Sequence, residues 1–280
     1  MEITDFADII YDKGDDGVVT VSFNTPKRKN ALTGLTFLEL RWALEHFQGD
    51  DDAHAMILTG APDPDSDDPT REAFSSGGFF SPDVYKDLPE EIMAQIDLGD
   101  FAQKASVLKF FQCDKPILAA INGLAIGGGF TLPLAVADQI YLSEHAWISL
   151  PFANLGISAE LGSTFLLPRL LGFQKAKEVI FYPERIDAHK AVELGIANAV
   201  LPHDELLAHT REQALRLIPP RGAGTAIREM KRAMHAPHVQ AISDALDLEN
   251  EALGKLFRST DFAEGITARV EKRTPVFTGN

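Results

Sequence analysis

The chain has 280 residues, of which 45% are hydrophobic and 24% charged, so it can bury a sizeable core and is not disordered as a whole. Its formal net charge of −15 makes it a poor non-specific binder of nucleic acid or of an anionic membrane. A single cysteine excludes an intramolecular disulfide framework and a cysteine-built zinc site. We expect a cytoplasmic location, because neither a signal peptide nor an apolar run long enough for a membrane helix is visible.

The first two thirds of the chain alternate strand and helix patterns. Short runs rich in β-branched and apolar residues predict strands at residues 17–23, 55–59, 116–121, 139–142 and 147–150. The first helix is expected to begin at Thr33 or Thr36 and to end near His46, and further helical sequence extends from about residue 81 to 112. Strands that alternate with helices indicate an α/β core with much parallel pairing.

Two further segments differ in composition from this core. An acidic, proline-broken stretch at residues 62–69 is expected to be an exposed surface loop. After Pro202 the chain becomes helical, in amphipathic segments separated by prolines. These helices are too few to bury their apolar faces alone, so we expect residues 203–280 to pack on residues 1–202 or on another subunit.

Two glycine clusters could carry chemistry, because glycines leave backbone N–H groups uncrowded by side chains. Gly77-Gly78 and Gly127-Gly128-Gly129 each follow a buried strand, and residues 130–134 indicate that a helix begins at the second cluster. Two N–H groups aimed at one point make an oxyanion hole, which stabilises negative charge on a carbonyl oxygen. The alternative is that both clusters are tight turns with close packing.

Glu160 is the candidate base. It is the only acidic residue between Glu144 and Glu178, and its neighbours in the sequence are mainly apolar. Apolar surroundings raise the pKa of a carboxyl group and let it act as a base near neutral pH. The alternative is that Glu160 lies at a helix N-terminus near a Ser158 cap and compensates the helix dipole.

Several segments spread in order along the chain share one resemblance. They are residues 30–32, 74–78, 115–129, 155–157, 167–172 and 259–277. Together they resemble the crotonase (enoyl-CoA hydratase/isomerase) superfamily over nearly the whole chain. The resemblance implies an α/β spiral core of repeated ββα turns over residues 1–202 and a C-terminal helical trimerisation region over residues 203–280. It also implies an acyl-CoA thioester substrate, a homotrimer or dimer of trimers, and no metal or redox cofactor.

The resemblance also assigns roles in the reaction. The N–H groups of Gly78 and Gly128 would receive the thioester carbonyl. Glu160 stands where the family's Δ3,Δ2-enoyl-CoA isomerases keep their single glutamate. Hydratases of the family carry two glutamates, at positions that are Thr131 and Phe152 here. Without that pair to hold and activate water, we expect isomerisation of a 3-enoyl-CoA to a trans-2-enoyl-CoA, as in fatty-acid β-oxidation.

The resemblance and the basic segments together suggest further contacts to the substrate. The expected substrate-binding residues are Lys29, Ala31, Ser76, Phe80, Thr131, Phe152, Asn154 and Lys272. Thr131 and Phe152 would wall the space in which a hydratase holds water, and Phe80 would narrow the acyl tunnel. Lys29 and Lys272 are candidates for the CoA phosphates, although surface lysines usually interact only with solvent.

Other activities on this fold stay open. Aryl-CoA dehalogenases use an aspartate near position 160 with a tryptophan and a histidine, which residues 157–159 do not supply. Carbon–carbon bond hydrolases add a histidine, for which His145 is a distant candidate. A hydratase, or an acyl-CoA-binding scaffold that has lost its catalytic glutamates, are the remaining alternatives. A pure interaction module fits poorly with two intact oxyanion loops.

Overall fold

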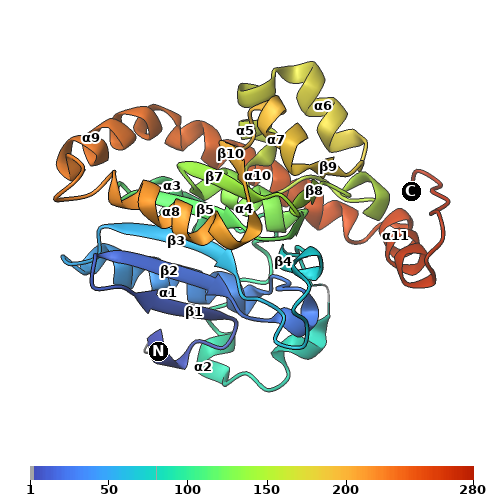
Figure 1. Cartoon of the computed structure of the whole chain (residues 1–280). Helices are drawn as coiled ribbons and strands as arrows, with labels where there is room; N and C mark the ends of the chain where they lie inside the picture. Colours follow the sequence, from blue (N-terminus) through green and yellow to red (C-terminus); the bar gives the residue numbers. More distant parts are fainter. Residues whose placement is uncertain (1–2, 80) are drawn as a thin grey trace.

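The computed structural model describes residues 3–79 and 81–280, and its strands form two sheets (Figure 1). Within these residues, the larger sheet has six strands in the order β1-β2-β3-β5-β7-β10 and the smaller has four in the order β4-β6-β8-β9. The strands of the larger sheet are β1 (Ile9–Lys13), β2 (Val18–Phe23), β3 (Ala55–Gly60), β5 (Ile117–Ile121), β7 (Gln139–Ser143) and β10 (Ala199–Leu201). Those of the smaller sheet are β4 (Ala73–Ser75), β6 (Leu124–Ile126), β8 (Trp147–Ser149) and β9 (Ile186–Asp187).

Most strand pairs are parallel, which confirms the α/β class. From β2 to β10 every neighbouring pair in the larger sheet is parallel, and only β1 joins β2 in antiparallel orientation. In the smaller sheet β4, β6 and β8 are parallel, and β9 pairs antiparallel with β8. Every residue of β3 and β5 is buried, as expected for central strands of a parallel sheet covered on both faces.

Helices cover both faces of the larger sheet (Figure 1). They are α1 (Gly34–Gly49), α2 (Glu90–Met93), α3 (Lys104–Phe111), α4 (Gly128–Val136), α5 (Ser163–Leu171), α6 (Phe173–Phe181), α7 (Ala188–Leu194), α8 (Leu206–Leu215), α9 (Gly224–His235), α10 (Val239–Leu256) and α11 (Thr260–Glu271). Met56 and Leu58 of β3 share the main core with side chains of α1 and α3, whereas Ile57 packs with Leu206 and Ala214 of α8. The alternation of side chains along one strand thus serves two layers of helices.

The N-terminal elements follow the sequence closely, but one expectation was wrong. The predicted strands are present, and Thr33 caps α1 in a reciprocal arrangement with Thr36. Residues 81–112, expected to be helical, form only short helices separated by turns. The carboxylates of Asp97 and Asp100 explain the break, because they accept N–H groups of the turn and of the first residues of α3.

The C-terminal helices pack on residues 1–202, which is one of the two arrangements expected from the sequence. α8 contacts β3, β5 and β7, and α10 contacts α3 and α5. α11 lies beside the short helix Ala153–Leu155, near the chain's C-terminus (Figure 1). The division of the chain at residue 202 stays a prediction. Within the described residues, no helix combines the length and the apolar character needed to cross a membrane.

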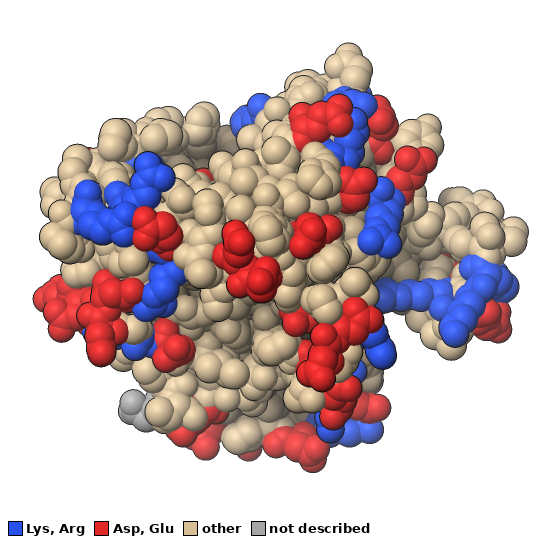
Figure 2. Space-filling model, in the orientation of Figure 1, with Lys and Arg blue, Asp and Glu red and all other residues tan. Residues whose placement is uncertain are grey.

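On the face shown in Figure 2, acidic side chains lie in several separate groups rather than in one patch. On the face shown, Lys and Arg side chains lie mostly beside Asp and Glu. Ion pairs in the structure include Arg211 with Asp16 at 2.5 Å and Arg228 with Asp114 at 3.0 Å. An anionic ligand therefore needs a local cationic or backbone site, because the overall field repels it.

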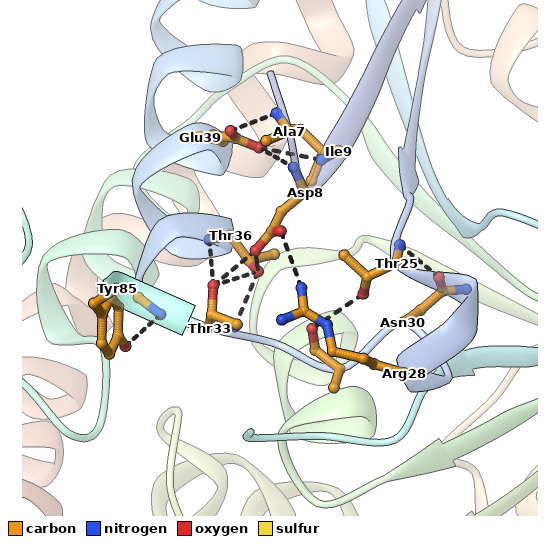
Figure 3. Close-up of polar contacts among 12 residues, drawn as sticks. Ala7, Asp8, Ile9, Thr25, Arg28, Asn30, Thr33, Thr36, Glu39 and Tyr85 are labelled. Atoms are coloured by element: carbon orange, nitrogen blue, oxygen red, sulfur yellow. Dashed lines mark hydrogen bonds and ion pairs between the residues drawn. The ribbon is translucent and has the colours of Figure 1, made fainter. Parts of the chain in front are cut away.

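A polar network fixes the start of α1 against β1 (Figure 3). The Asp8 carboxylate accepts hydrogen bonds from the hydroxyls of Thr33 and Thr36, at 2.7 and 2.6 Å, and lies 3.3 Å from the Arg28 guanidinium. Nearby, the Asn30 side chain accepts from the Thr25 N–H and donates to two backbone carbonyls. These contacts hold residues 25–33 in one conformation, and this segment lies beside the candidate site described below.

The carboxylate of Glu39 in α1 completes this network (Figure 3). It is fully buried and accepts the N–H groups of Ala7, Asp8 and Ile9 at 2.7, 2.8 and 3.1 Å. The pKa of Glu39 is raised from 4.5 to about 7: burial is the largest cause and the negative charge of Asp8 adds to it, while the three N–H donors lower the pKa. Deprotonation of Glu39 therefore costs more in the folded chain than in the unfolded chain.

We predict that Glu39 makes stability depend on pH. Because the folded chain keeps the Glu39 proton between about pH 4.5 and 7 while the unfolded chain loses it, its contribution to stability falls as pH rises through that window. Measured by urea denaturation, the unfolding free energy of Glu39→Gln minus that of wild type should rise by roughly 2–3 kcal/mol between pH 4 and pH 8. A difference that does not change with pH would contradict this.

Candidate active site

The first glycine cluster is bound to residues 28–32 by backbone hydrogen bonds. Leu32 N–H donates to the Gly77 carbonyl at 2.8 Å, and Phe79 N–H donates to the Leu32 carbonyl at 2.9 Å. This pairing holds Gly78 beside Leu32 in an isolated parallel bridge. Among the described residues, the Gly78 N–H has no hydrogen-bond partner, so it is free to bind a ligand.

The second cluster lies at the start of α4, as the sequence predicted. Gly127 precedes the helix with φ 52° and ψ −123°, a conformation open essentially to glycine alone. Gly77 also has a positive φ, 83°, and a Cβ built on it would lie 2.3 Å from the Ile126 carbonyl oxygen. The two loops therefore approach each other so closely that a side chain at residue 77 would separate them.

Glu160 joins these loops from a third segment. It lies in a non-helical stretch before α5, which begins at Ser163 after the N-cap Gly162, so the interpretation of Glu160 as a helix N-terminal acid with a Ser158 cap was wrong. Its carboxyl lies against Gly128, since a Cβ on Gly128 would be 2.9 Å from Glu160 Oε1. Gly78, Gly128 and Glu160 line one pocket of about 400 Å³.

The surroundings of Glu160 favour its protonated form. Its pKa is raised from 4.5 to about 8: burial is the largest cause and the negative charge of Glu249 adds to it, while the Gly128 N–H opposes both by hydrogen bonding to the carboxylate. A carboxyl with a pKa near the working pH both accepts and returns protons readily. Glu160 therefore has the proton affinity of a general base, and it lies beside an N–H group that can stabilise negative charge.

The remaining walls of the pocket are mainly apolar. Its apolar and aromatic lining consists of Leu32, Phe37, Phe79, Tyr85, Ile96, Leu98, Phe101, Phe257 and Phe262. Asp97 and Asp100 also line it, but their carboxylates accept backbone N–H groups. Such a pocket suits an acyl chain next to a polar reacting group. Phe257 and Phe262 come from the C-terminal helices, a contribution that sequence reasoning had not assigned.

Comparison with known proteins identifies the family of the chain. The sequence profile described as "Enoyl-CoA hydratase/isomerase" matches residues 13–280. The chain is 31% identical to a "Probable enoyl-CoA hydratase" of Rhodobacter capsulatus, over 94% of this chain and 95% of that one. It is 30% identical to a "Crotonyl-CoA hydratase" of Syntrophomonas wolfei, over 97% and 98%. The crystal structure of an enoyl-CoA hydratase from Mycobacterium avium subsp. paratuberculosis superposes with a TM-score of 0.80 at 28% identity, covering 97% and 99%.

The chain belongs to the enoyl-CoA hydratase/isomerase family. The match spans both the sheets and the C-terminal helices, which confirms the crotonase fold expected from the resemblance. Family membership establishes the fold and the general class of enzyme. It does not decide between hydration and isomerisation, so the residues around Glu160 have to be considered individually.

Thr131 and Phe152 lie behind the second glycine cluster rather than on the lining of the pocket. Thr131 is fully buried in α4, and its hydroxyl donates to the Gly127 carbonyl at 3.3 Å. Phe152 is 3% exposed, and its ring would lie 3.7 Å from a Cβ on Gly127. Neither side chain brings a second carboxylate to Glu160.

Three other expected substrate contacts, Ala31, Ser76 and Asn154, lie outside the lining of this pocket. Ala31 is buried, and Ser76 joins the first loop to residues 28–29 by two hydrogen bonds. Asn154 is exposed and lines a separate pocket beneath α11. Phe80 lies outside the described residues. The roles of these residues in substrate binding stay predictions.

The two lysines proposed for the CoA phosphates differ in their surroundings. Lys29 Nζ donates to the Arg71 carbonyl at 2.9 Å and lies 3.5 Å from the Asp63 carboxylate of the acidic loop. Lys272 is exposed at the end of α11. An acidic partner already neutralises Lys29 in part, so binding of a phosphate there would have to displace Asp63.

His145, the candidate for a carbon–carbon bond hydrolase, is not part of the site. It packs beside His203, with ring centroids 5.9 Å apart, and His203 in turn contacts Ser143 and Glu72. Among the described residues that line the pocket there is no histidine or tryptophan. The hydrolase and dehalogenase alternatives therefore lack their partner side chains.

We predict that Gly77→Ala disrupts the site, because its Cβ would meet the Ile126 carbonyl oxygen at 2.3 Å. Gly195→Ala is the matched control, since Gly195 has a similar φ of 78° and nothing within 4 Å of its Cβ position. By chemical denaturation, Gly77→Ala should lose about 1–3 kcal/mol more than the control. Equal losses would show that the two loops have room to separate.

Proposed function

We propose that the chain is an acyl-CoA double-bond isomerase that converts a 3-enoyl-CoA to the trans-2-enoyl-CoA. The observation that carries this proposal is that Glu160 lines one pocket together with Gly78 and Gly128. The other carboxylates in that lining, Asp97 and Asp100, accept backbone N–H groups instead. The positions at which family hydratases keep their glutamates hold Thr131 and Phe152, both buried behind the loop. One carboxyl suffices for moving a double bond, whereas activating water in this family uses two.

In the proposed reaction, Glu160 moves one proton within the substrate. The thioester oxygen binds between the N–H groups of Gly78 and Gly128, and the Glu160 carboxylate removes a proton from C2. The electron pair of that C–H bond delocalises to the thioester oxygen as a dienolate. Protonated Glu160 then gives the proton to C4, and the C2–C3 double bond forms. One base serves both carbons because they flank the same planar allyl system.

The contact between Glu160 and Gly128 suits this charge movement. In the free site, the Gly128 N–H stabilises the Glu160 carboxylate. When Glu160 takes the proton, the negative charge passes to the thioester oxygen, which the same N–H can then stabilise. Each oxyanion donor contributes roughly 10²–10³ in rate in other enzymes, and a positioned base roughly 10²–10⁴.

Hydration is the second candidate, and the names of the relatives favour it. The relatives from Rhodobacter capsulatus and Syntrophomonas wolfei are both named hydratases, at 31% and 30% identity. Hydration would require Glu160 alone to activate a water molecule for attack on C3. A hydratase assay is therefore the necessary companion to any isomerase assay.

We predict that Glu160→Gln abolishes isomerisation of trans-3-hexenoyl-CoA without unfolding the chain, because the amide cannot accept the C2 proton. Formation of the conjugated thioester is followed by ultraviolet absorbance, and folding by circular dichroism. Glu144→Gln is the matched control, since Glu144 is exposed and does not line the pocket. Retained activity in Glu160→Gln would refute the assigned base, and rapid hydration of crotonyl-CoA by wild type would favour the second candidate.

We also propose that the chain assembles as a homotrimer through its C-terminal helices. Met230 and Met234 of α9 and Leu248 of α10 are more than half exposed, which leaves apolar surface for another subunit to cover. Light scattering should then give three or six times the chain mass of 30.6 kDa. A monomer mass would refute this assembly.

A further inference from the structure

A buried carboxylate from the C-terminal helices reaches the loop that carries Glu160. Glu249 of α10 is 2% exposed and lies on the face of the helix that also buries Ile242, Leu246 and Leu253. Burying a charged side chain in such an apolar stripe destabilises the fold unless hydrogen-bond donors or an opposite charge compensate it. The partners of Glu249 therefore indicate what it does.

All three hydrogen-bond donors to Glu249 lie directly after Glu160. Its carboxylate accepts the Gly162 N–H at 2.8 Å, the Thr164 N–H at 3.0 Å and the Thr164 hydroxyl at 2.5 Å. These N–H groups belong to the first turn of α5, whose N-cap, Gly162, has no capping side chain of its own. Glu249 thus supplies from a distant helix the cap that α5 lacks.

The turn between Glu160 and α5 needs such support. Leu161 has a φ of 58°, in the left-handed region that a branched apolar residue seldom adopts. The Glu160 carbonyl accepts hydrogen bonds from the N–H and hydroxyl of Ser163, at 3.1 and 2.6 Å. The conformation of this turn sets the direction of the Glu160 side chain, and Glu249 binds the N–H groups of Gly162 and Thr164 at its end.

We propose that Glu249 is a positioning residue for Glu160: its buried carboxylate fixes the turn from residue 160 to 164 and thereby holds the base against Gly128. This inference rests on the proposed function in that it takes Glu160 as the base. It links the C-terminal helices to the chemistry, because a displacement of α10 would release the turn. Glu249 itself does not line the pocket.

The charge of Glu249 also acts on Glu160, and other charged groups near α10 have partners elsewhere. Lys104 of α3 pairs with Asp247, and Asp100 before α3 accepts from Asn250. Arg169 of α5 and His238 both contact Phe165. Glu249 is the charged side chain that raises the pKa of Glu160, while burial raises the pKa of Glu249 itself.

The test compares Glu249→Gln with Glu251→Gln, an exposed glutamate on the same helix that makes no contact with the turn. Misplacement of the base should lower kcat for trans-3-hexenoyl-CoA by about 10²-fold in Glu249→Gln, with KM nearly unchanged. Loss of the neighbouring charge should move the acid limb of the kcat/KM profile to lower pH by about one unit. Wild-type kcat and acid limb in Glu249→Gln would overturn the proposal.

Two further variants keep the test decisive if Glu249→Gln fails to fold. Thr164→Val removes one donor and leaves the carboxylate, so kcat should fall less than in Glu249→Gln, again without a change in KM. Glu249→Asp keeps the charge but shortens the side chain, so kcat should fall while the acid limb stays in place. Wild-type kcat in both variants would contradict a positioning role.

A substrate-free measurement separates this inference from the proposed function. In protein labelled with ¹³C at the glutamate carboxyl carbons, the Glu160 signal is the one lost in Glu160→Gln. Its titration midpoint, about 8 in wild type, should move down in Glu249→Gln and stay in place in Glu251→Gln. If wild type does not isomerise but the midpoint moves, only the proposed function fails. If wild type does not isomerise, an unchanged midpoint in Glu249→Gln overturns the inference; if it does, an unchanged midpoint together with wild-type kcat overturns it.

Discussion

The contact between the Glu160 carboxyl and the Gly128 N–H is the interaction on which the site depends. Burial and a neighbouring carboxylate raise the pKa of Glu160 to about 8, and the N–H group limits that rise. In the proposed reaction, the same N–H stabilises the negative charge that develops on the thioester oxygen. One backbone group would then act on both the proton affinity of Glu160 and the oxyanion.

Much of the remaining structure holds the Glu160 carboxyl, the Gly128 N–H and Gly78 in place. Parallel strands end at the glycine loops, and the network around Asp8 fixes residues 28–32, against which residues 77–79 pair. Gly77 allows the loops to touch, and Glu249 accepts the Gly162 N–H in the turn after Glu160. The C-terminal helices thus contribute to the acyl pocket through Phe257 and Phe262 and to the base through α10.

Local patterns predicted the parts of the fold that depend on neighbouring residues. The strand at 55–59, the Thr33 cap and the helix start at Gly128 each have a short-range signal, and each is present. The helical expectation for residues 81–112 was wrong because aspartate side chains bind backbone N–H groups there. The partnership of Glu249 with Gly162 spans 87 residues and has no local signal beyond one acid in an apolar stripe. The pairing of Lys29 with Asp63 likewise has no local sequence signal, since it depends on the conformation of the acidic loop.

The most direct test of a single-carboxyl isomerase is to run the reaction of trans-3-hexenoyl-CoA in D₂O and measure deuterium at C4 of the product by mass spectrometry and NMR. If Glu160 carries one proton from C2 to C4, the conjugated product should form with less than one deuterium at C4, because part of the original C2 proton is returned before it exchanges. Formation of a 3-hydroxyacyl-CoA as the main product, or full deuteration at C4 in the Glu160→Gln variant, would contradict the account.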